Sequence, residues 1–233
     1  MRIGIGLPSG IPGTPGPLLI EWARRAEGGP FTSLGAIDRV AYDCHEPMAA
    51  LAAAAAVTER VRLATMAVIA PLRSTGVLAK EAATIDALSG GRLTLGLAVG
   101  ARTEDFDAAG VPHAGRGARF EEQLAELRDL WEGGPGPKAS PELLVGGASD
   151  AAFARMARYG DGYVHSGARP GRSPGPPIER GRRGQTWAGR AIPRCGVSPT
   201  SPWGTTPGSS AWPTCATTTR SPGRSPSGSP RPS

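Results

Sequence analysis

Short apolar runs alternate with longer segments of helical period over the first two thirds of the chain. The runs are bounded by Gly, Pro, Asp or Ser, which is typical of strands. They are Arg2–Leu7, Phe31–Ile37, Arg62–Ile69, Leu93–Val99, Leu143–Val145 and Gly162–His165. The segments between them predict helices over Leu18–Glu27, Pro47–Thr58, Thr75–Leu88, Arg119–Trp131 and Asp150–Arg158. The polar stretch Ala101–Gly117 predicts a loop.

This alternation predicts the fold class. Apolar strands that are each followed by a helix are typical of a parallel sheet with crossover connections. Units of this kind in series, without a Gly-rich nucleotide fingerprint, favour an eight-fold barrel over a doubly wound sheet. The chain supplies about six units rather than eight. We therefore predict an α/β fold, an incomplete (β/α)8 TIM-type barrel with an irregular or disordered C-terminal tail.

Composition divides the chain near Ser166. Residues 1–165 carry 16 Lys and Arg against 19 Asp and Glu, a net charge of −3. Residues 166–233 carry 10 Arg and a single acid, Glu179, with no Leu, Phe or Tyr. Such a segment cannot bury enough apolar surface to offset the entropy of ordering it. We predict a barrel portion over 1–165 and a disordered, low-complexity Arg/Pro/Ser/Gly tail over 166–233.

In another reading frame, the codons of the tail would encode apolar residues at positions where a strand needs them. If each codon starts at the third base of the present one, Ser codons of the TCN type become Phe, Leu, Ile or Val codons. The segment Cys195–Gly204 (CGVSPTSPWG) then permits RGIAYFALG, a strand and a turn. Free third bases mean that the sequence permits this reading without proving it. We favour a frameshift near Ser166 over an evolved tail, because evolved tails of this composition are usually repetitive.

Several classes of partner are disfavoured. An Arg-rich tail could bind nucleic acid by counterion release, but this one lacks Lys and has only isolated Trp residues, so we expect no nucleic-acid partner. No apolar run approaches the ~20 residues of a membrane span, and the first residues lack a signal-peptide pattern, so we expect a cytoplasmic protein without a membrane partner. Cys44, Cys195 and Cys215 show no CxxC spacing, which indicates neither a metal site nor a disulfide framework.

Active sites of barrels lie at the carboxyl ends of the strands. The residues at these positions are Pro8-Ser9, Asp38-Arg39, Ala70-Pro71, Gly100 and Gly146–Ser149. The segment Gly146-Gly147-Ala148-Ser149 precedes a helix and could bind a phosphate with backbone N–H groups and a hydroxyl. The alternative is an ordinary N-cap by Ser149 or Asp150. Gly96, Ala98 and Gly100 could leave room for a flat ring, or could fill a narrow barrel layer.

Several motifs together resemble the luciferase-like monooxygenase family, barrel-shaped oxidoreductases that use FMN or the deazaflavin F420. They are IDR, LAKEAATIDALSGGRLTLGLAVG, EDFDAAGV, RGARFEEQL, PELLVGGAS and YGDGYV, and the resemblance covers about residues 1–165. It implies a flavin- or F420-dependent oxidoreductase or monooxygenase that acts on a small organic substrate by hydride transfer or O₂ activation. It also implies FMN or coenzyme F420 as cofactor, and a homodimer for the intact enzyme. The alternative for this chain is an inactive remnant; an aldolase- or isomerase-type barrel is disfavoured, because no Lys or Glu stands at a strand end.

The resemblance also implies site residues. The family tends to bulge the third strand against the cofactor ring, commonly with a non-proline cis peptide, at the place of Met66 and Ala67. The expected cofactor-binding residues are Met66, Ala67, Ala98, Gly100, Gly146, Gly147 and Ser149. Asp38 and Arg39, the expected catalytic residues, stand where the family often has an acidic residue followed by histidine. Arg39 departs from that pattern: it cannot act as a base but can bind an anionic substrate or a reduced cofactor. The alternative for this pair is an Asp–Arg ion pair at the barrel rim.

Overall fold

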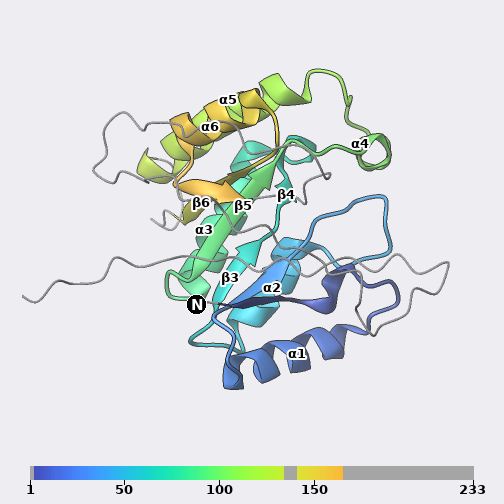
Figure 1. Cartoon of the computed structure of the whole chain (residues 1–233), viewed down its shortest axis with the longest axis vertical. Helices are drawn as coiled ribbons and strands as arrows, with labels where there is room; N and C mark the ends of the chain where they lie inside the picture. Colours follow the sequence, from blue (N-terminus) through green and yellow to red (C-terminus); the bar gives the residue numbers. More distant parts are fainter. Residues whose placement is uncertain (1–2, 134–140, 165–233) are drawn as a thin grey trace, which may run out of the picture.

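The strands of the chain form one parallel sheet. The computed structural model describes residues 3–133 and 141–164. The sheet order is β1-β2-β3-β5-β6-β7, with β4 paired to β5, and every pairing is parallel (Figure 1). The strands are β1 (Gly4–Gly6), β2 (Ser33–Ala36), β3 (Arg62–Thr65), β4 (Val68–Ile69), β5 (Leu93–Ala98), β6 (Glu142–Gly146) and β7 (Gly162–Val164).

Helices connect these strands. They are α1 (Gly16–Gly28), α2 (Pro47–Ala55), α3 (Thr75–Leu88), α4 (Thr103–Ala109), α5 (Arg116–Gly133) and α6 (Asp150–Tyr159), with short 3₁₀ turns η1 (Pro8–Gly10) and η2 (Ala70–Leu72). The start of α2 shows why local sequence specifies a helix. Pro47 occupies the first turn, where its missing N–H is not needed, and the Glu46 side chain accepts a hydrogen bond from Ala49 N at 2.6 Å. An alanine run then carries the helix forward.

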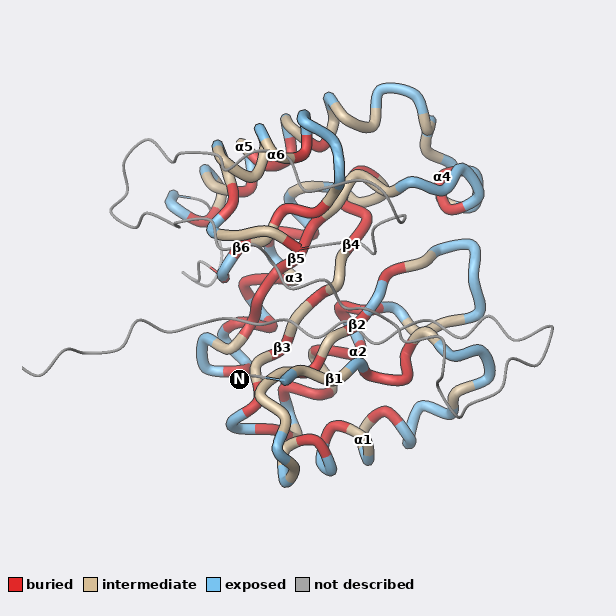
Figure 2. The backbone as a smooth tube through the Cα atoms, viewed as in Figure 1, coloured by how far each residue is buried: buried red, intermediate tan, exposed pale blue. Residues whose placement is uncertain are grey.

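The hydrophobic core lies between the helices and one face of the sheet. Alternate strand residues point into it, among them Leu34, Leu63, Leu95 and Leu143, all with no exposed surface. Because side chains alternate across a strand, the residues between these leucines lie on the opposite, inner face. Figure 2 shows the buried positions concentrated along the central strands and on the sides of the helices that face them.

The architecture confirms the predicted fold class. Along the order β1-β2-β3-β5-β6-β7 the parallel strands follow one another in the chain, with at least one helix between successive strands, and the sheet curls as an incomplete (β/α) barrel. The predicted end of the last strand, His165, and the predicted tail over 166–233 lie outside the described residues. No helix in the described ranges is long and apolar enough to cross a bilayer.

Two elements differ from the sequence prediction. The single strand expected over Arg62–Ile69 is two strands, β3 and β4. The loop expected over Ala101–Gly117 contains α4, which has the acidic residues Glu104 and Asp105 in its first turn. Acidic side chains favour a helix start, but a helix of seven residues is too short for an apolar period to reveal it.

A polar chain crosses the inner face at the amino end of the sheet. The Arg62 guanidinium donates to Thr94 Oγ1 at 2.9 Å and to Glu142 Oε2 at 3.1 Å. Thr94 Oγ1 in turn donates to the same Glu142 oxygen at 2.8 Å. These three side chains come from β3, β5 and β6, and they satisfy one another's hydrogen-bonding groups.

Candidate functional site

The inner face is lined with small residues toward its carboxyl end. These residues belong to β1, β2, β5 and β6, and they are Gly6, Gly35, Gly96, Ala98 and Gly146. Contacts across the face agree with this placement, because a Cβ added to Gly146 would lie 3.3 Å from the Ala98 Cβ. Two larger side chains approach these small residues: Met66 lies near Gly35, and Val164 lies near Gly146.

A β-bulge interrupts the strand beside this face. Ala64 pairs with Thr94, whereas Val68 pairs with Leu97, so β3–β4 contains one residue more than the matching stretch of β5. Thr65 bridges the gap: its hydroxyl donates to Gly96 O and accepts from Gly96 N, both at 2.7 Å. The peptide bond between Met66 and Ala67 is cis. The bulge and the cis bond occur where the resemblance implied them, while the cofactor contact of Met66 and Ala67 stays a prediction.

Asp38 is buried just beyond the end of β2. Its Oδ2 accepts from Ile69 N at 2.9 Å and from the Arg73 guanidinium at 3.1 Å, and Arg73 also pairs with Glu46 at 2.8 Å. Burial raises the pKa of Asp38 above its ordinary value, although Arg73 and the Ile69 N–H oppose this effect. Asp38 thus ties β2 to the end of β4, next to the bulge.

Arg39 has a different acidic partner. Its Nε donates to Asp105 Oδ2 at 2.8 Å, and a terminal nitrogen lies 3.4 Å from Glu104. Asp105 is 1% exposed and also accepts from the N–H groups of Val40 and Ala41, each at 2.9 Å. Burial alone would raise the pKa of Asp105, but these donors and Arg39 outweigh it and hold the pKa below its ordinary value.

Asp38 and Arg39 therefore both form ion pairs at the rim, each with a partner distant in sequence. The alternative prediction, an ion pair between Asp38 and Arg39 themselves, differs from the structure, because Asp38 pairs with Arg73 and Arg39 pairs with Asp105. Their catalytic role stays a prediction. Asp105, which sequence reasoning missed, connects the loop after β2 to α4 and thereby shapes the rim. The one local signal for Asp105 in the sequence was its place directly before Phe106, which is completely buried.

Gly100 marks the carboxyl end of β5. Its φ is 74°, a conformation that favours glycine, and an added Cβ would lie 2.5 Å from the Ile69 side chain. Arg116 Nε donates to Gly100 O at 3.1 Å, which brings the start of α5 to this point. Gly100 therefore serves close packing at the rim, whichever of its two predicted roles applies.

The Gly146–Ser149 segment connects β6 to α6. Gly147 has a φ of 138°, and an added Cβ would lie 2.6 Å from the Ala152 Cβ. Its carbonyl oxygen accepts a hydrogen bond from the Tyr163 hydroxyl. Ser149 caps α6, because its Oγ accepts from Ala152 N at 3.2 Å. The N-cap reading is thus observed, and phosphate binding by Gly146, Gly147 and Ser149 stays a prediction.

The other rim positions hold packing residues. Ser9, Ala70 and Pro71 are buried. Burial, followed by the charge of Asp38, raises the pKa of the Cys44 thiol, whose Sγ donates to Arg39 O at 3.3 Å. The described ranges contain no group of His, Cys, Asp and Glu side chains arranged to hold a metal ion.

Several solved structures align with this fold over about 70% of the chain. Monooxygenase RslO1 from Streptomyces bottropensis aligns with a TM-score of 0.62 and 27% identity, over 70% of this chain and 59% of that one. The oxygenating constituent of 3,6-diketocamphane monooxygenase from Pseudomonas putida, in complex with FMN, aligns at 0.60 with 20% identity, over 70% of this chain and 57% of that one. An F420-dependent secondary alcohol dehydrogenase aligns at 0.61 with 19% identity, over 71% and 58%. The last two likenesses concern the fold alone.

Sequence comparison points the same way. The chain is 35% identical to an uncharacterized protein of Mycobacterium tuberculosis over 136 residues, 51% of this chain and 47% of that protein. It is 34% identical over 138 residues to pyrimidine monooxygenase RutA of Methylobacterium radiotolerans, 50% of this chain and 36% of that protein. The chain thus spans about half the length, or less, of these relatives. A family model described as luciferase-like monooxygenase matches residues 1–202, a range that crosses the boundary predicted at residue 166. With the curled parallel sheet and its bulged strand, this match shows that the chain belongs to the luciferase-like monooxygenase family.

Proposed function

We propose that the chain derives from, and is shaped for, a flavin- or F420-dependent oxidoreductase acting on a small organic substrate. The cofactor, FMN or coenzyme F420, would lie on the inner face at the carboxyl end of the sheet and would supply hydride transfer or oxygen activation. Structures of the same fold bind these molecules: the P. putida enzyme was solved with FMN, and the alcohol dehydrogenase with an F420–acetone adduct. The observation that carries the proposal is the set of small inner-face residues beside the bulge.

The geometry of that surface suits a planar ring. A Cβ added to Gly6 would find no atom closer than 3.9 Å, so the space above this position is open. At Gly96 an added Cβ would lie 2.3 Å from Thr65 O, so the backbones themselves form the surface there. At the positions of Gly6, Gly96 and Ala98, a surface of backbone and single methyl groups can contact a flat aromatic ring closely.

Ser149 could hold a phosphate at the edge of this surface. Its Oγ accepts from the α6 backbone, which leaves the hydroxyl hydrogen available as a donor. The positive end of a ten-residue helix begins at the same place. Asp150 adds a negative charge to this turn, which weakens the phosphate binding expected from the helix alone.

Asp38 and Arg39 would act from the rim. Asp38 holds the end of β4 through Ile69 N, so its loss would move the bulge relative to the inner face. Arg39, side-chain exposure 17%, could reach an anionic ligand only by sharing the guanidinium that Asp105 already binds. Both catalytic assignments therefore rest on the resemblance.

The full chain can be tested by titration with FMN and, separately, with F420, followed by the cofactor's fluorescence. The informative variant is Gly6→Leu, whose side chain would project over the inner face, with Gly6→Ala as its matched control. We expect Gly6→Leu to weaken binding by about tenfold or more, since the steric loss of even ~1.4 kcal/mol has that effect. Gly6→Ala should change it less than about threefold. If neither cofactor binds the chain or its full-length repaired form, the proposal is wrong.

A second candidate is that the chain as written is an inactive remnant of such an enzyme. Its support is the composition of residues 166–233, with 10 Arg and no Leu, Phe or Tyr. Resequencing the gene around the Ser166 codon tests the frameshift directly. A confirmed register together with cofactor binding by this chain would exclude the remnant.

A further inference from the structure

Ile37 lies at the carboxyl end of the inner face. Burial alternates along β2 and one step past it: every second residue up to Asp38 is buried, and the residues between them are not. Side chains alternate across extended backbone, so Ile37 points the same way as Gly35. The strand pairing also continues here, because Met66 N donates to Ala36 O at 2.7 Å. Ile37 therefore stands two strand residues, about 6.6 Å, beyond Gly35, and it is 42% exposed.

The loops after β1 and β2 hold Ile37 between them. A Cβ added to Gly10, in η1, would lie 2.5 Å from Ile37 Cδ1, so the ethyl branch of Ile37 reaches this turn. Hydrogen bonds join the two loops: His45 N donates to Ser9 O at 2.9 Å, and a His45 ring nitrogen lies 2.7 Å from Thr14 O. The Ile37 side chain thus has a fixed place at the opening of the inner face.

Other apolar side chains of these two loops are exposed as well. Ile11 is 61% exposed, and Val40 and Tyr42 are 42% and 41% exposed. The charged side chains of the loop after β2, and its Cys44 and His45, instead have partners within the protein; they are Asp38, Arg39, Asp43, Cys44, His45 and Glu46. Single exposed apolar side chains are common, but several on two joined loops indicate a surface that binds apolar groups.

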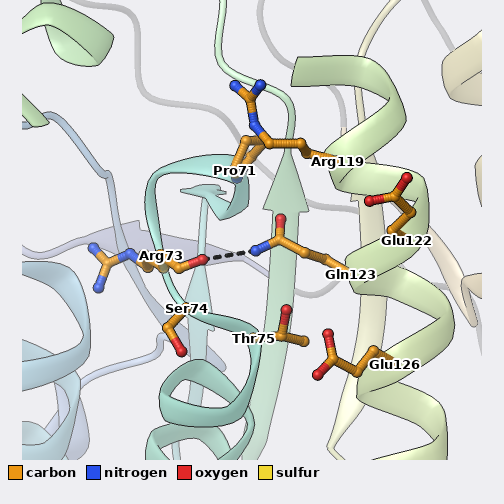
Figure 3. A pocket seen from close by; sticks show the side chains of 8 residues that line it. All are labelled: Pro71, Arg73, Ser74, Thr75, Arg119, Glu122, Gln123 and Glu126. Carbon is orange, nitrogen blue, oxygen red and sulfur yellow. Dashed lines mark hydrogen bonds between the residues drawn. The ribbon is translucent and has the colours of Figure 1, made fainter. Parts of the chain in front are cut away.

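The two arginines of this rim are already neutralised. Arg39 binds Asp105 at 2.8 Å, and Arg73 binds two carboxylates, at 3.1 and 2.8 Å. Gln123 of α5 also donates to Arg73 O at 2.7 Å, and Figure 3 shows the Arg73 guanidinium directed away from α5. An anionic ligand at this opening would lose water without gaining an unpaired positive charge from either arginine.

We propose that the substrate is an uncharged molecule whose apolar ring or chain contacts Ile37, and that the size of this side chain limits which molecules fit over the cofactor. This inference rests on the proposed function, because it takes the inner face as the cofactor surface. The contact with Gly10 is what makes the size of residue 37 matter. A larger side chain has no room toward η1 and would extend over the inner face, whereas a smaller one would widen the opening.

The test uses the full chain with ¹³C-labelled isoleucine methyl groups, saturated with whichever of FMN and F420 binds, and titrated with cyclohexanone. We expect a saturable shift of the Ile37 Cδ1 methyl signal, with a dissociation constant on the order of millimolar, as for other ligands of this size. Cyclohexanecarboxylate has the same ring with a negative charge. It should bind at least about tenfold more weakly, because its charge would be desolvated without a partner.

Variants locate the binding. Ile37→Thr replaces the ethyl branch with a hydroxyl and should weaken cyclohexanone binding about tenfold, measured by saturation transfer from the protein to the ligand, because the contact of two carbon groups is lost. The matched control is Val77→Thr, at a residue of α3 that is 58% exposed, and should change binding less than about threefold. Both variants should bind the cofactor within about threefold of the unmodified chain.

The outcomes separate this inference from the proposed function. If a cofactor binds, equal affinity for the ketone and the carboxylate, no saturable shift at Ile37, or equal effects of the two variants would overturn this inference alone. If neither cofactor binds, the proposed function fails and this inference fails with it. The comparison of the two ligands on the unmodified chain decides the matter even if Ile37→Thr fails to fold.

Discussion

Replacing Asp105 with Ala removes the acceptor that connects α4 to the loop after β2. The Asp105 carboxylate is 1% exposed and accepts from Arg39 Nε at 2.8 Å and from two backbone N–H groups at 2.9 Å. The alanine variant leaves all three donors without this acceptor, in a region where Arg39 is only 17% exposed. Breaking a buried charge pair by removing one partner costs about 3–5 kcal/mol. We expect a loss of this size, a large share of the ~5–15 kcal/mol that stabilises a typical domain.

Urea unfolding followed by tryptophan fluorescence measures the loss, and Asp107→Ala is the matched control. Asp107 lies on the same helix with an exposed side chain, so its removal should change the free energy of unfolding by less than ~0.5 kcal/mol. Acid adds a second check. The pKa of Asp105 in the folded chain lies below its ordinary 3.8, so its contribution is present above 3.8 and disappears as the pH falls through the folded-state value. A loss under ~1 kcal/mol for Asp105→Ala, or one equal to that of the control, would refute the reasoning.

Two further substitutions test other parts of the framework. Thr65→Val removes the hydroxyl that bridges to both Gly96 N and Gly96 O, and should lower the free energy of unfolding by about 2 kcal/mol or more. Thr65→Ser keeps the hydroxyl and should keep most of the stability. Similar urea midpoints for the two variants would contradict the bridging role. Glu27 accepts from the N–H groups of residues 59–61, and these bonds hold its pKa below the ordinary 4.5 although burial opposes them. The contribution of Glu27 to stability is therefore present above pH 4.5 and lost in acid. The difference in the free energy of unfolding between the unmodified chain and Glu27→Gln should narrow from about pH 6 to about pH 3.5. Parallel stability curves against pH would show that the charge of Glu27 is not involved.

The order of strands and helices was predictable because it depends on local periodicity. The buried strand around Leu95 and the alanine-rich helix after Pro47 each carry their own signal. The break between β3 and β4 was not visible in that pattern, because a one-residue slip in register leaves no mark in the run Arg62–Ile69, which is apolar apart from Arg62 and Thr65. The resemblance to a family implied the bulge; the residues alone did not.

Side-chain partners at the rim were harder to predict. Arg39 and Asp105 are 66 residues apart, and Asp38 and Arg73 are 35 apart, so neither pairing follows from local spacing. The sequence placed Asp38 and Arg39 at the correct edge of the sheet, because the carboxyl ends of parallel strands meet there. Which charge each would meet depended on how α4 and η2 fold back over that edge. Long-range packing of this kind leaves almost no trace in a single sequence.

The hydrogen-bonded Arg62–Thr94–Glu142 chain makes the two ends of the concave sheet chemically unlike. An apolar aromatic molecule at the amino end would displace water from these charged, mutually hydrogen-bonded side chains. It would offer no hydrogen bond to replace that water, so the desolvation would cost free energy. In the proposed cofactor complex, the ring would therefore lie on the glycine-rich backbone, and its anionic substituents would extend away from the amino end of the sheet.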